Sequence, residues 1–313
     1  MKKYLDVNGV TSLYKIIMGK VDDKLDEKLQ LLLTPSTRPL TFEVLENGTF
    51  SFITNGTPTG SVSYSLDSGT TWTALSAGSS TPTIPAGSKV LWKGDYKGAG
   101  SFKYGKFSST GKFNVSGNVI SLMYGDDFKD KTDLTGSNYC FIGLFKGCSK
   151  LMDVSDLILP ATTLASSCYN NMFSDCTSLK TAPELPVTTL ASSCYSNMFS
   201  GCTSLTTAPE LPATELADSC YQDMFYNCTS LTTAPVLPAT TLAKYCYGTM
   251  FNGCPKLNYI KALFTTTPGS SYTNNWVSGV ASTGTFVKNA AATWNVTGES
   301  GIPSGWTVET ATA

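Results

Sequence analysis

Apolar residues return at a fixed interval through the middle of the chain. The pair Cys-Tyr, and the pair Met-Phe four residues after it, recur every 26 residues from residue 168 onward, as 194 − 168 = 26 shows. A second cysteine and a leucine follow in every copy. An earlier, degraded copy starts at Cys140, and 168 − 140 = 28 places two inserted residues after it. Self-similarity at a period of about 20 to 29 residues is typical of leucine-rich repeats, so the pattern predicts a solenoid of five stacked units over residues 125–261.

Each unit is predicted to contain a helix of two to three turns and a short strand. In the copy that starts at Leu159, the apolar residues 164, 165, 168, 172 and 173 fall on one face of a helix. The extended stretch from Thr181 to Leu185 is kept short by Pro183 and Pro186. Such a unit cannot bury its apolar face alone, and stacking therefore closes a continuous core. The threonines 181, 207 and 233 are expected to form a row along the stack.

Residues 1–38 are predicted to form an N-terminal helix and a linker. Apolar residues recur there at intervals of three or four, charged residues fill the opposite face, and Pro35 ends the helix. Packing on its own domain is one interpretation of this helix. We favour oligomerisation or anchoring, because the helix is terminal and a proline-containing linker follows it. A homotrimer is the favoured oligomer, although so short a stripe does not fix the strand number. The residues of the predicted interface are Val10, Leu13, Ile17, Val21, Leu25, Leu29 and Leu32.

Residues 39–124 are predicted to form an immunoglobulin-like all-β sandwich, because short alternating segments are separated by Asn-Gly and other glycine turns. Ser65 to Trp72 resembles the Asp-box of sialidases and many β-proteins. The resemblance implies a hairpin in which Asp67 binds backbone N–H groups and Trp72 fills the core, with no catalytic role for Asp67. After residue 261 the repeat pattern decays, and residues 262–313 are predicted to be a β-rich cap that seals the last unit.

Composition limits the functions that this chain is expected to have. The formal net charge is −1, and charged residues make up 14%, against about 25% in an average protein. No basic patch is present, so we expect no nucleic-acid partner. Histidine is absent, which removes the commonest general base and metal ligand, and we expect neither an enzyme nor a cofactor. The start lacks a signal-peptide pattern and no apolar run is long enough for a membrane helix, so we expect no membrane insertion.

All ten cysteines belong to the repeat, two in each unit and eight residues apart. Buried free thiols that pack as small apolar side chains are the favoured interpretation. Disulfides remain an alternative, but the missing signal peptide argues for a reducing site of synthesis. A metal site is less favoured because the spacing does not suit zinc, and a nucleophilic cysteine lacks a histidine to activate it.

Two further sets of residues are candidates for binding. The acidic cluster of Asp126, Asp127, Asp130 and Asp133 is interpreted as a solvated loop, because a calcium loop has a different order of residues. The tyrosines of the Cys-Tyr pairs form either an aromatic stripe for sugars or a structural slot, and their identity in every complete unit favours the slot. Positions that differ between units are better candidates for receptor contact: Asn170, Asn171, Ser196, Asn197, Gln222, Asp223, Tyr226 and Asn252.

The unit Met-Phe-x-x-Cys-x-x-Leu followed by Leu-Pro-x-x-x-Leu resembles the BspA-type leucine-rich repeats of bacterial surface proteins. The stretch from Pro39 to Val308 resembles proteins of gut Bacteroidales bacteria and their bacteriophages, which share the Asp-box domain, the segment Lys112 to Asn118, the repeats and a Gly-Ile-Pro-x-Gly-Trp-Thr-Val end. Residues 3–10 resemble the virion-anchoring start of phage head and tail fibre proteins.

These resemblances imply binding rather than catalysis. The expected protein is a head or tail fibre or decoration subunit located in the virion. It attaches to other virion proteins by its N-terminal helix and contacts a host-surface or mucosal glycan or protein through its repeats. The alternative is a BspA-type adhesin on a bacterial cell surface, exported without a recognisable signal peptide.

Overall fold

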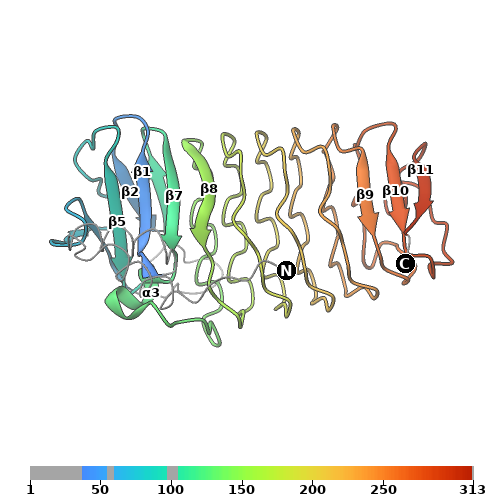
Figure 1. Ribbon diagram of the computed structural model, residues 1–313, viewed down its shortest axis with the longest axis horizontal. Coiled ribbons are helices and arrows are strands. Elements are labelled where there is room, and N and C mark those ends of the chain that lie inside the picture. Colours follow the sequence, from blue (N-terminus) through green and yellow to red (C-terminus); the bar gives the residue numbers. More distant parts are fainter. Residues whose placement is uncertain (1–36, 55–59, 97–104, 312–313) are drawn as a thin grey trace, which may run out of the picture.

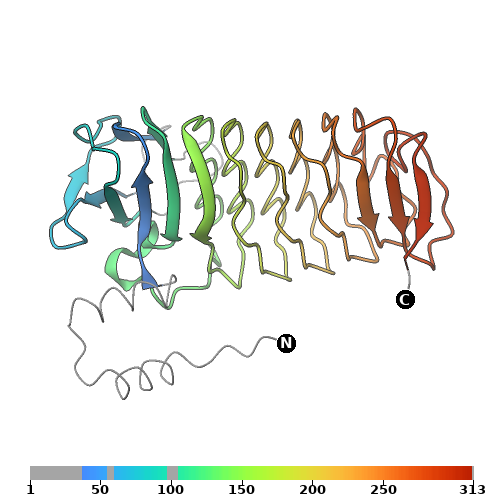
Figure 2. The same cartoon turned by 45° about the horizontal axis from the view of Figure 1, so that its top comes forward.

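The computed structural model describes residues 37–54, 60–96 and 105–311, and in this part the protein is mostly β, with several sheets and one short α-helix. It is a straight rod in which a β-rich end, a stack of coils and a small terminal sheet follow one another (Figures 1 and 2). We use coil for one complete turn of the chain around the rod, which corresponds to one repeat. The predicted helix over residues 9–33 lies outside the described residues, together with its interface residues, and stays a prediction.

The N-terminal end is built on a six-stranded sheet with the order β4-β3-β5-β1-β7-β8. Strand β1 (Leu40–Val44) lies antiparallel between β5 (Lys89–Gly94) and β7 (Phe113–Asn118). Strand β3 (Val62–Ser65) pairs with β5 on one side and with β4 (Thr73–Leu75) on the other.

A second layer covers one face of this sheet. It consists of β2 (Phe50–Thr54) paired with β6 (Gly105–Ser109). The alternation of apolar and polar residues places Phe107 of β6 against the large sheet, with its ring centroid 4.9 Å from Phe42 and 4.8 Å from Trp92. In their described part, residues 39–124 are thus mostly β, although not entirely as the all-β prediction has it. A short helix, α3 (Ser121–Tyr124), and the 3₁₀ turn η2 (Gly125–Asp127) follow β7.

The β-rich end and the stack of coils share one sheet and one core. Strand β8 (Leu151–Ile158), from the first coil, pairs parallel with β7. Inside, the ring of Phe107 stacks on Phe145 at 5.7 Å, and Phe145 stacks on Phe173 of the next coil at 5.6 Å. The buried residues form a single cluster that runs from β1 to the C-terminal sheet. The position predicted as a domain boundary, between residues 124 and 125, therefore has apolar contacts across it.

The predicted helix of each repeat is wrong. Residues 165–176 form consecutive four-residue turns, because Ser167, Asn171 and Asp175 have φ angles of 54°, 55° and 61°, in the left-handed region that ends a right-handed helix. Alternate N–H groups bond three residues back, as Met172 does to Tyr169 O at 3.2 Å. The others bond to the next coil, as Tyr169 does to Cys194 O at 3.0 Å. We call these segments the turn ladder; it comprises residues 139–148, 165–176, 191–202, 217–228 and 243–254.

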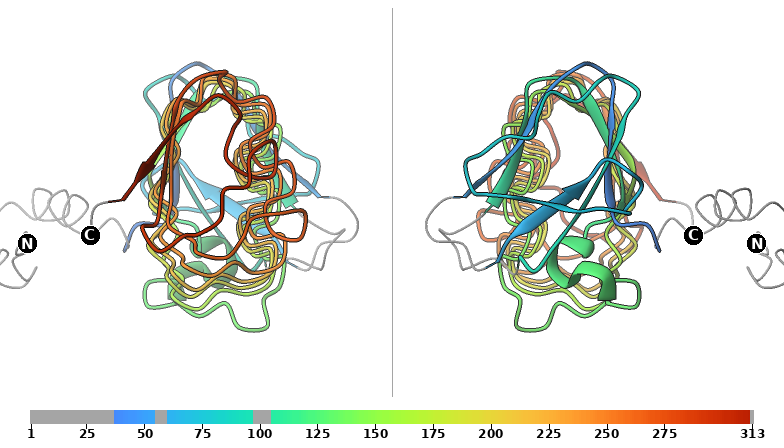
Figure 3. Two further views of the ribbon diagram at one scale, coloured as in Figure 1. Left: turned by 90° about the vertical axis from the view of Figure 1, so that its right-hand side faces the viewer. Right: turned by 90° about the vertical axis from the view of Figure 1, so that its left-hand side faces the viewer.

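The opposite wall of each coil is extended, as the view along the rod shows (Figure 3). Only its two ends form regular strands in the described part: β8 at one end, and the parallel strands β9 (Tyr259–Ala262), β10 (Thr285–Lys288) and β11 (Thr307–Thr310) at the other. In between, isolated parallel bridges join Thr207 to Thr233 and Thr233 to Tyr259. Thr207 and Thr233 thus lie in the predicted row, whereas no bridge joins Thr181 to Thr207.

The β-rich segment predicted after residue 261 contains β10 and β11 and begins as a further, degraded coil. The turn ladder continues into it, since Phe251 N donates to Trp276 O at 2.8 Å and Asn275 and Gly279 have positive φ angles. Trp276 is fully buried between Tyr247, Phe251 and Phe264. The Trp276 side chain thus fills the interior of the rod where the columns of tyrosine and phenylalanine rings end.

Candidate binding surfaces

The tyrosines of the Cys-Tyr pairs point into the core and form a column along the rod. The rings of Tyr169, Tyr195, Tyr221 and Tyr247 stack at 5.8 to 6.1 Å, with interplanar angles of 4° to 8°. No more than 2% of any of these residues is exposed. A sugar cannot reach them, so the aromatic-stripe interpretation is wrong and the structural slot is confirmed.

The cysteines form two further internal columns. All ten are free and buried, as the favoured interpretation requires. In the second column, the thiols of Cys202, Cys228 and Cys254 each donate to the carbonyl of the phenylalanine in the preceding coil at 3.1 Å. Burial raises the pKa of Cys148 to about 11 and that of Cys140 to about 12, so these groups are thiols near neutral pH and poor nucleophiles.

The acidic residues near η2 do not converge. The Asp126 carboxylate pairs with Lys93 Nζ at 2.6 Å, whereas Asp133 accepts a hydrogen bond from Thr135 N at 2.8 Å. Among the described residues, no three cysteine or acidic side chains lie close enough together to hold a metal ion.

The Asp-box hairpin is present and its carboxylate has a structural position. Asp67 accepts hydrogen bonds from Thr71 Oγ1 at 2.6 Å, from Thr71 N at 2.9 Å and from Ser65 Oγ at 2.7 Å. These bonds lower the pKa of Asp67 to about 2, with the Thr71 hydroxyl as the largest cause. Trp72 does not fill the core, because it is half-buried at the surface. Its Nε1 donates to Gly69 O at 3.0 Å, and Lys93 Nζ lies 4.3 Å from its ring centroid.

The candidate receptor contacts lie on the turn ladder, where several of them have a backbone role. Asn171, Asn197 and Asp223 occupy left-handed positions at φ 55° to 56°. The Thr249 hydroxyl donates to the half-buried Asp223, and burial raises the pKa of this carboxyl. Tyr226 is the most exposed of the eight, at 36%. The remaining residues, Asn170, Ser196, Gln222 and Asn252, are half-buried or buried. Receptor contact at these positions stays a prediction.

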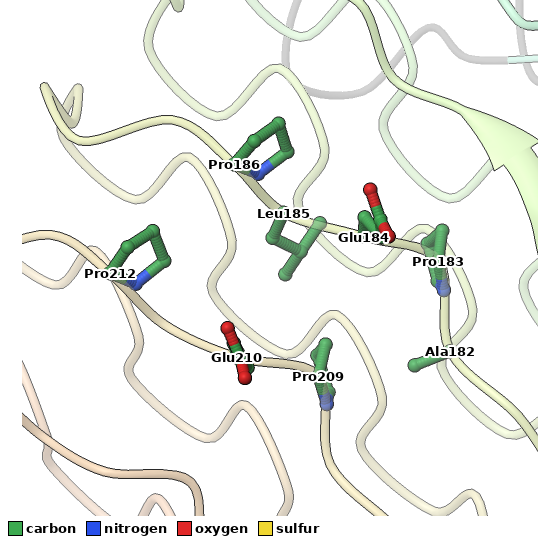
Figure 4. A pocket seen from close by; sticks show the side chains of 8 residues that line it. All are labelled: Ala182, Pro183, Glu184, Leu185, Pro186, Pro209, Glu210 and Pro212. Carbon is green, nitrogen blue, oxygen red and sulfur yellow. The ribbon is translucent and has the colours of Figure 1, made fainter. Parts of the chain in front are cut away.

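Sequence reasoning missed a groove on the extended wall. Its central cavity, of about 470 Å³, lies between two consecutive coils and is lined by Ala182, Pro183, Glu184, Leu185, Pro186, Pro209, Glu210 and Pro212 (Figure 4). The cavity exists because two prolines in each segment remove donors and prevent strand pairing. No backbone hydrogen bond joins residues 182–187 to residues 208–213, both of which the structure describes. The wall closes two junctions further along, where the facing strand β9 has no proline and Ala234 N donates to Tyr259 O at 3.0 Å.

Three smaller cavities adjoin the central one and share residues with it or with each other. We call the four together the lateral groove. A cavity of about 340 Å³ is formed by Ser155 to Pro160 with Glu184 and Pro186. A second, of about 310 Å³, is formed by Ser155, Lys180, Thr181, Ala182, Thr206, Thr207, Ala208 and Pro209. A third, of about 260 Å³ over the outer face of the large sheet, is formed by Arg38, Thr41, Glu43, Lys89, Asn114, Val115, Ser116, Asp153, Ser155 and Asp156. In the sequence, the only signal for the lateral groove is the repeated segment Ala-Pro-x-Leu-Pro.

No family model, curated protein or solved structure matches the chain. In the described part of the chain, no helix combines the length and the apolar character needed to cross a membrane. The geometry of the described residues offers two candidate binding surfaces, the polar turn ladder with Tyr226 and the lateral groove.

Proposed function

We propose that the chain is a non-enzymatic structural protein of a bacteriophage virion, a head or tail fibre or decoration subunit that presents its stack of coils to a host-surface or mucosal receptor. The N-terminal helix attaches it to other virion proteins, as a homo-oligomer with a trimer favoured. The immunoglobulin-like β-domain acts as a spacer. The sequence resemblances to BspA-type repeats and to fibre proteins motivate this assignment.

The observation that carries the proposal is the unbroken column of stacked rings. The phenylalanine rings from Phe145 to Phe251 follow one another at 5.5 to 5.8 Å with nearly parallel planes. Backbone bonds reinforce each step, as when Phe173 N donates to Met198 O at 2.9 Å and Asp175 N to Ser200 O at 2.7 Å. A rod of this kind holds a binding surface at a fixed distance from its attachment point, which is what a fibre or spike requires.

The test is the location of the protein. Virions purified on a density gradient are analysed by mass spectrometry and by immunoblotting against this chain. The proposal expects the protein to co-sediment with the major capsid protein at a constant ratio across the gradient. Recovery in the outer-envelope fraction of uninfected bacteria instead would overturn the virion assignment in favour of the bacterial surface adhesin.

The attachment role of the N-terminal helix has its own measurement. The mass of the full-length protein in solution is compared with that of a chain that starts at Pro39. An oligomer that becomes a monomer on truncation supports assembly through Val10, Leu13 and their neighbours in the stripe. Two monomers would show that the helix does not cause self-association.

A further inference from the structure

Two cavities of the lateral groove join into one acidic trough. The central cavity and the cavity beside β8 share Glu184 and Pro186 in their linings, so they are continuous along the rod. We call their joined lining, residues 155–160 and 182–186 with 209, 210 and 212, the acidic trough. Three consecutive coils contribute one carboxylate each, from Asp156, Glu184 and Glu210. All three residues are exposed, and none forms an ion pair within the described part of the chain.

Among the described residues that line the acidic trough, none is a lysine or an arginine. The cations of the lateral groove lie in its other two cavities. Lys180 lines the cavity of about 310 Å³, and Arg38 and Lys89 lie over the large sheet among the carboxylates of Glu43, Asp153 and Asp156. The trough therefore carries three negative charges without a cation in its own lining, and charge complementarity favours a cationic ligand.

The rest of the acidic trough is apolar. Each glutamate lies between two prolines of its own segment, and Ala182 and Leu185 complete the central cavity (Figure 4). Ile158 and Pro160 line the part beside β8. Carboxylates beside ring surfaces suit a lysine or arginine side chain, because its methylene stem packs on apolar groups while its charged end reaches a carboxylate. A metal ion would make no use of the prolines.

The backbone of the acidic trough is unpaired. Within the described part of the chain, residues 182–187 and 208–213 take part in no backbone hydrogen bond, because two prolines in each segment remove donors and prevent strand pairing. Their remaining N–H and C=O groups have to bind water or a ligand. An extended peptide offers donors and acceptors along its own backbone, whereas a helix uses most of these groups internally. The trough thus favours an extended peptide over a helical one.

The spacing of the three carboxylates also fits an extended peptide. They recur once in each coil, and the stacked rings of consecutive coils are 5.5 to 6.1 Å apart. Side chains on one side of an extended chain recur at every second residue, about 6.6 Å apart. A peptide that lies along the rod can therefore place one cationic side chain beside the carboxylate of each coil.

We propose that the acidic trough binds an extended peptide segment of a partner protein that carries lysine or arginine at alternate positions. The peptide lies along the rod, its charged ends pair with Asp156, Glu184 and Glu210, and its methylene stems pack on the prolines. This proposal rests on the proposed receptor-binding function and narrows the receptor to a protein with a basic extended segment.

The test measures binding of the full-length protein to immobilised probes. The main probe is a peptide in which lysine alternates with serine. The second has the same number of lysines at every third residue, which puts successive lysines on opposite sides of an extended chain. A peptide in which glutamate alternates with serine and a neutral oligosaccharide of hexose units complete the set. The groove variants are E184Q/E210Q and E184K/E210K, and the matched control D127N/E309Q removes two exposed carboxylates outside the groove.

The alternating lysine peptide should bind, and its binding should weaken as the salt concentration rises, because salt screens exposed charges. E184Q/E210Q should weaken binding by about tenfold, since it removes two exposed ion pairs, and E184K/E210K should abolish it. The peptide with lysine at every third residue should bind less tightly. D127N/E309Q should bind as the wild type does, and all variants should keep the wild-type melting temperature.

Three results would contradict this proposal. Equal binding of the two lysine peptides would rule out the extended register, and binding that E184Q/E210Q leaves unchanged would rule out the site. Binding only to the neutral oligosaccharide or only to the glutamate peptide would show that positive charge does not select the ligand. Failure of the proposed function looks different, because absence of the protein from purified virions would reject the virion assignment while peptide binding by the trough persisted.

Discussion

Asn197 illustrates how single residues determine the turn ladder. Its φ angle of 56° lies in the left-handed region, where glycine and asparagine are tolerated and alanine is strained. We expect Asn197→Ala to lower the free energy of unfolding by about 1 kcal/mol relative to Asn197→Gly. Both variants lose the bond from Asn197 Nδ2 to Ser196 Oγ, so their difference isolates the backbone effect. Equilibrium urea unfolding measures it. A helix at this position would give the opposite order, with alanine more stable than glycine.

The stability that the Asp67 carboxylate contributes to the fold should depend on pH in the acid range. Its folded pKa of about 2 lies below the value of about 3.9 in an unfolded chain, so the carboxylate stabilises the fold fully above about pH 4. This contribution is lost as the pH falls through about 2, because the protonated group accepts fewer hydrogen bonds. We expect Asp67→Asn to melt at a lower temperature than the wild type at pH 6, and the gap to narrow steadily down to pH 2. A gap that stays constant over this range would show that the charge has no part in the hairpin.

At the scale of an element, the spacing of apolar residues alone does not distinguish a helix from a series of four-residue turns. Apolar pairs at 164–165, 168–169 and 172–173 suit a helix and a four-residue turn almost equally, because 3.6 and 4 differ little over so short a segment. The deciding signal was the residue type at the position before the apolar pairs. Residue types that tolerate left-handed φ angles occur at two positions of each coil, four residues apart. The first position holds Asn171, Asn197 and Asp223, and the second holds Asp175, Gly201 and Asn227.

Other elements were predictable because their chemistry is local. The Asp-box follows from Ser65, Asp67 and Gly69 within one hairpin. The buried thiols follow from the identity of each cysteine position in every unit. The lateral groove was not predictable in the same way, because it depends on two prolines in each of two coils and on which backbone groups remain unpaired after stacking. The prediction that Trp72 fills the core was wrong, because no local sequence pattern indicates that the Lys93 side chain lies over its ring.

Because of the buried thiols in the two cysteine columns, we expect the stability of the fold to be unusually sensitive to alkaline pH. Burial raises the pKa of Cys148 to about 11 and of Cys246 to about 12, whereas an unfolded thiol titrates near about 8.5. Between these values the unfolded state binds fewer protons than the folded state, so stability falls as the pH rises. Each such thiol lowers the free energy of unfolding by about 1.4 kcal/mol per pH unit. Thermal unfolding from pH 7 to pH 10 should therefore show a steep fall in melting temperature above about pH 8.5.

A variant with fewer thiols provides the control for this effect. Cys202→Ala and Cys228→Ala together remove two of the groups while leaving the ring columns in place. At pH 7 the double variant should be less stable than the wild type, because each site loses a packed sulfur and its bond to a carbonyl. Its melting temperature should then fall less steeply with pH. An equal slope in both proteins would assign the alkaline loss to other groups.

At the scale of the whole molecule, the repeat makes the rod a stack whose length is set by the number of coils. Every coil contacts only its neighbours, through the ring columns and the turn-ladder hydrogen bonds. Removing one complete coil should therefore leave a folded rod, whereas removing a fraction of a coil should not. Residues 195–220 are such a coil, since 221 − 195 = 26, and their deletion joins Cys194 to Tyr221 and restores the Cys-Tyr pair.

We expect this deletion to give a monodisperse protein with an unchanged circular-dichroism spectrum shape and a cooperative unfolding transition. Small-angle X-ray scattering should find it shorter by one coil, which the tyrosine spacing puts at 5.8 to 6.1 Å. Deletion of residues 195–207, half a coil, is the control, because it places polar residues in the columns and should yield unfolded or aggregated protein. The full-coil deletion also removes Pro209 and Glu210 from the lateral groove. A full-coil deletion that fails to fold would show that the coils are not interchangeable units.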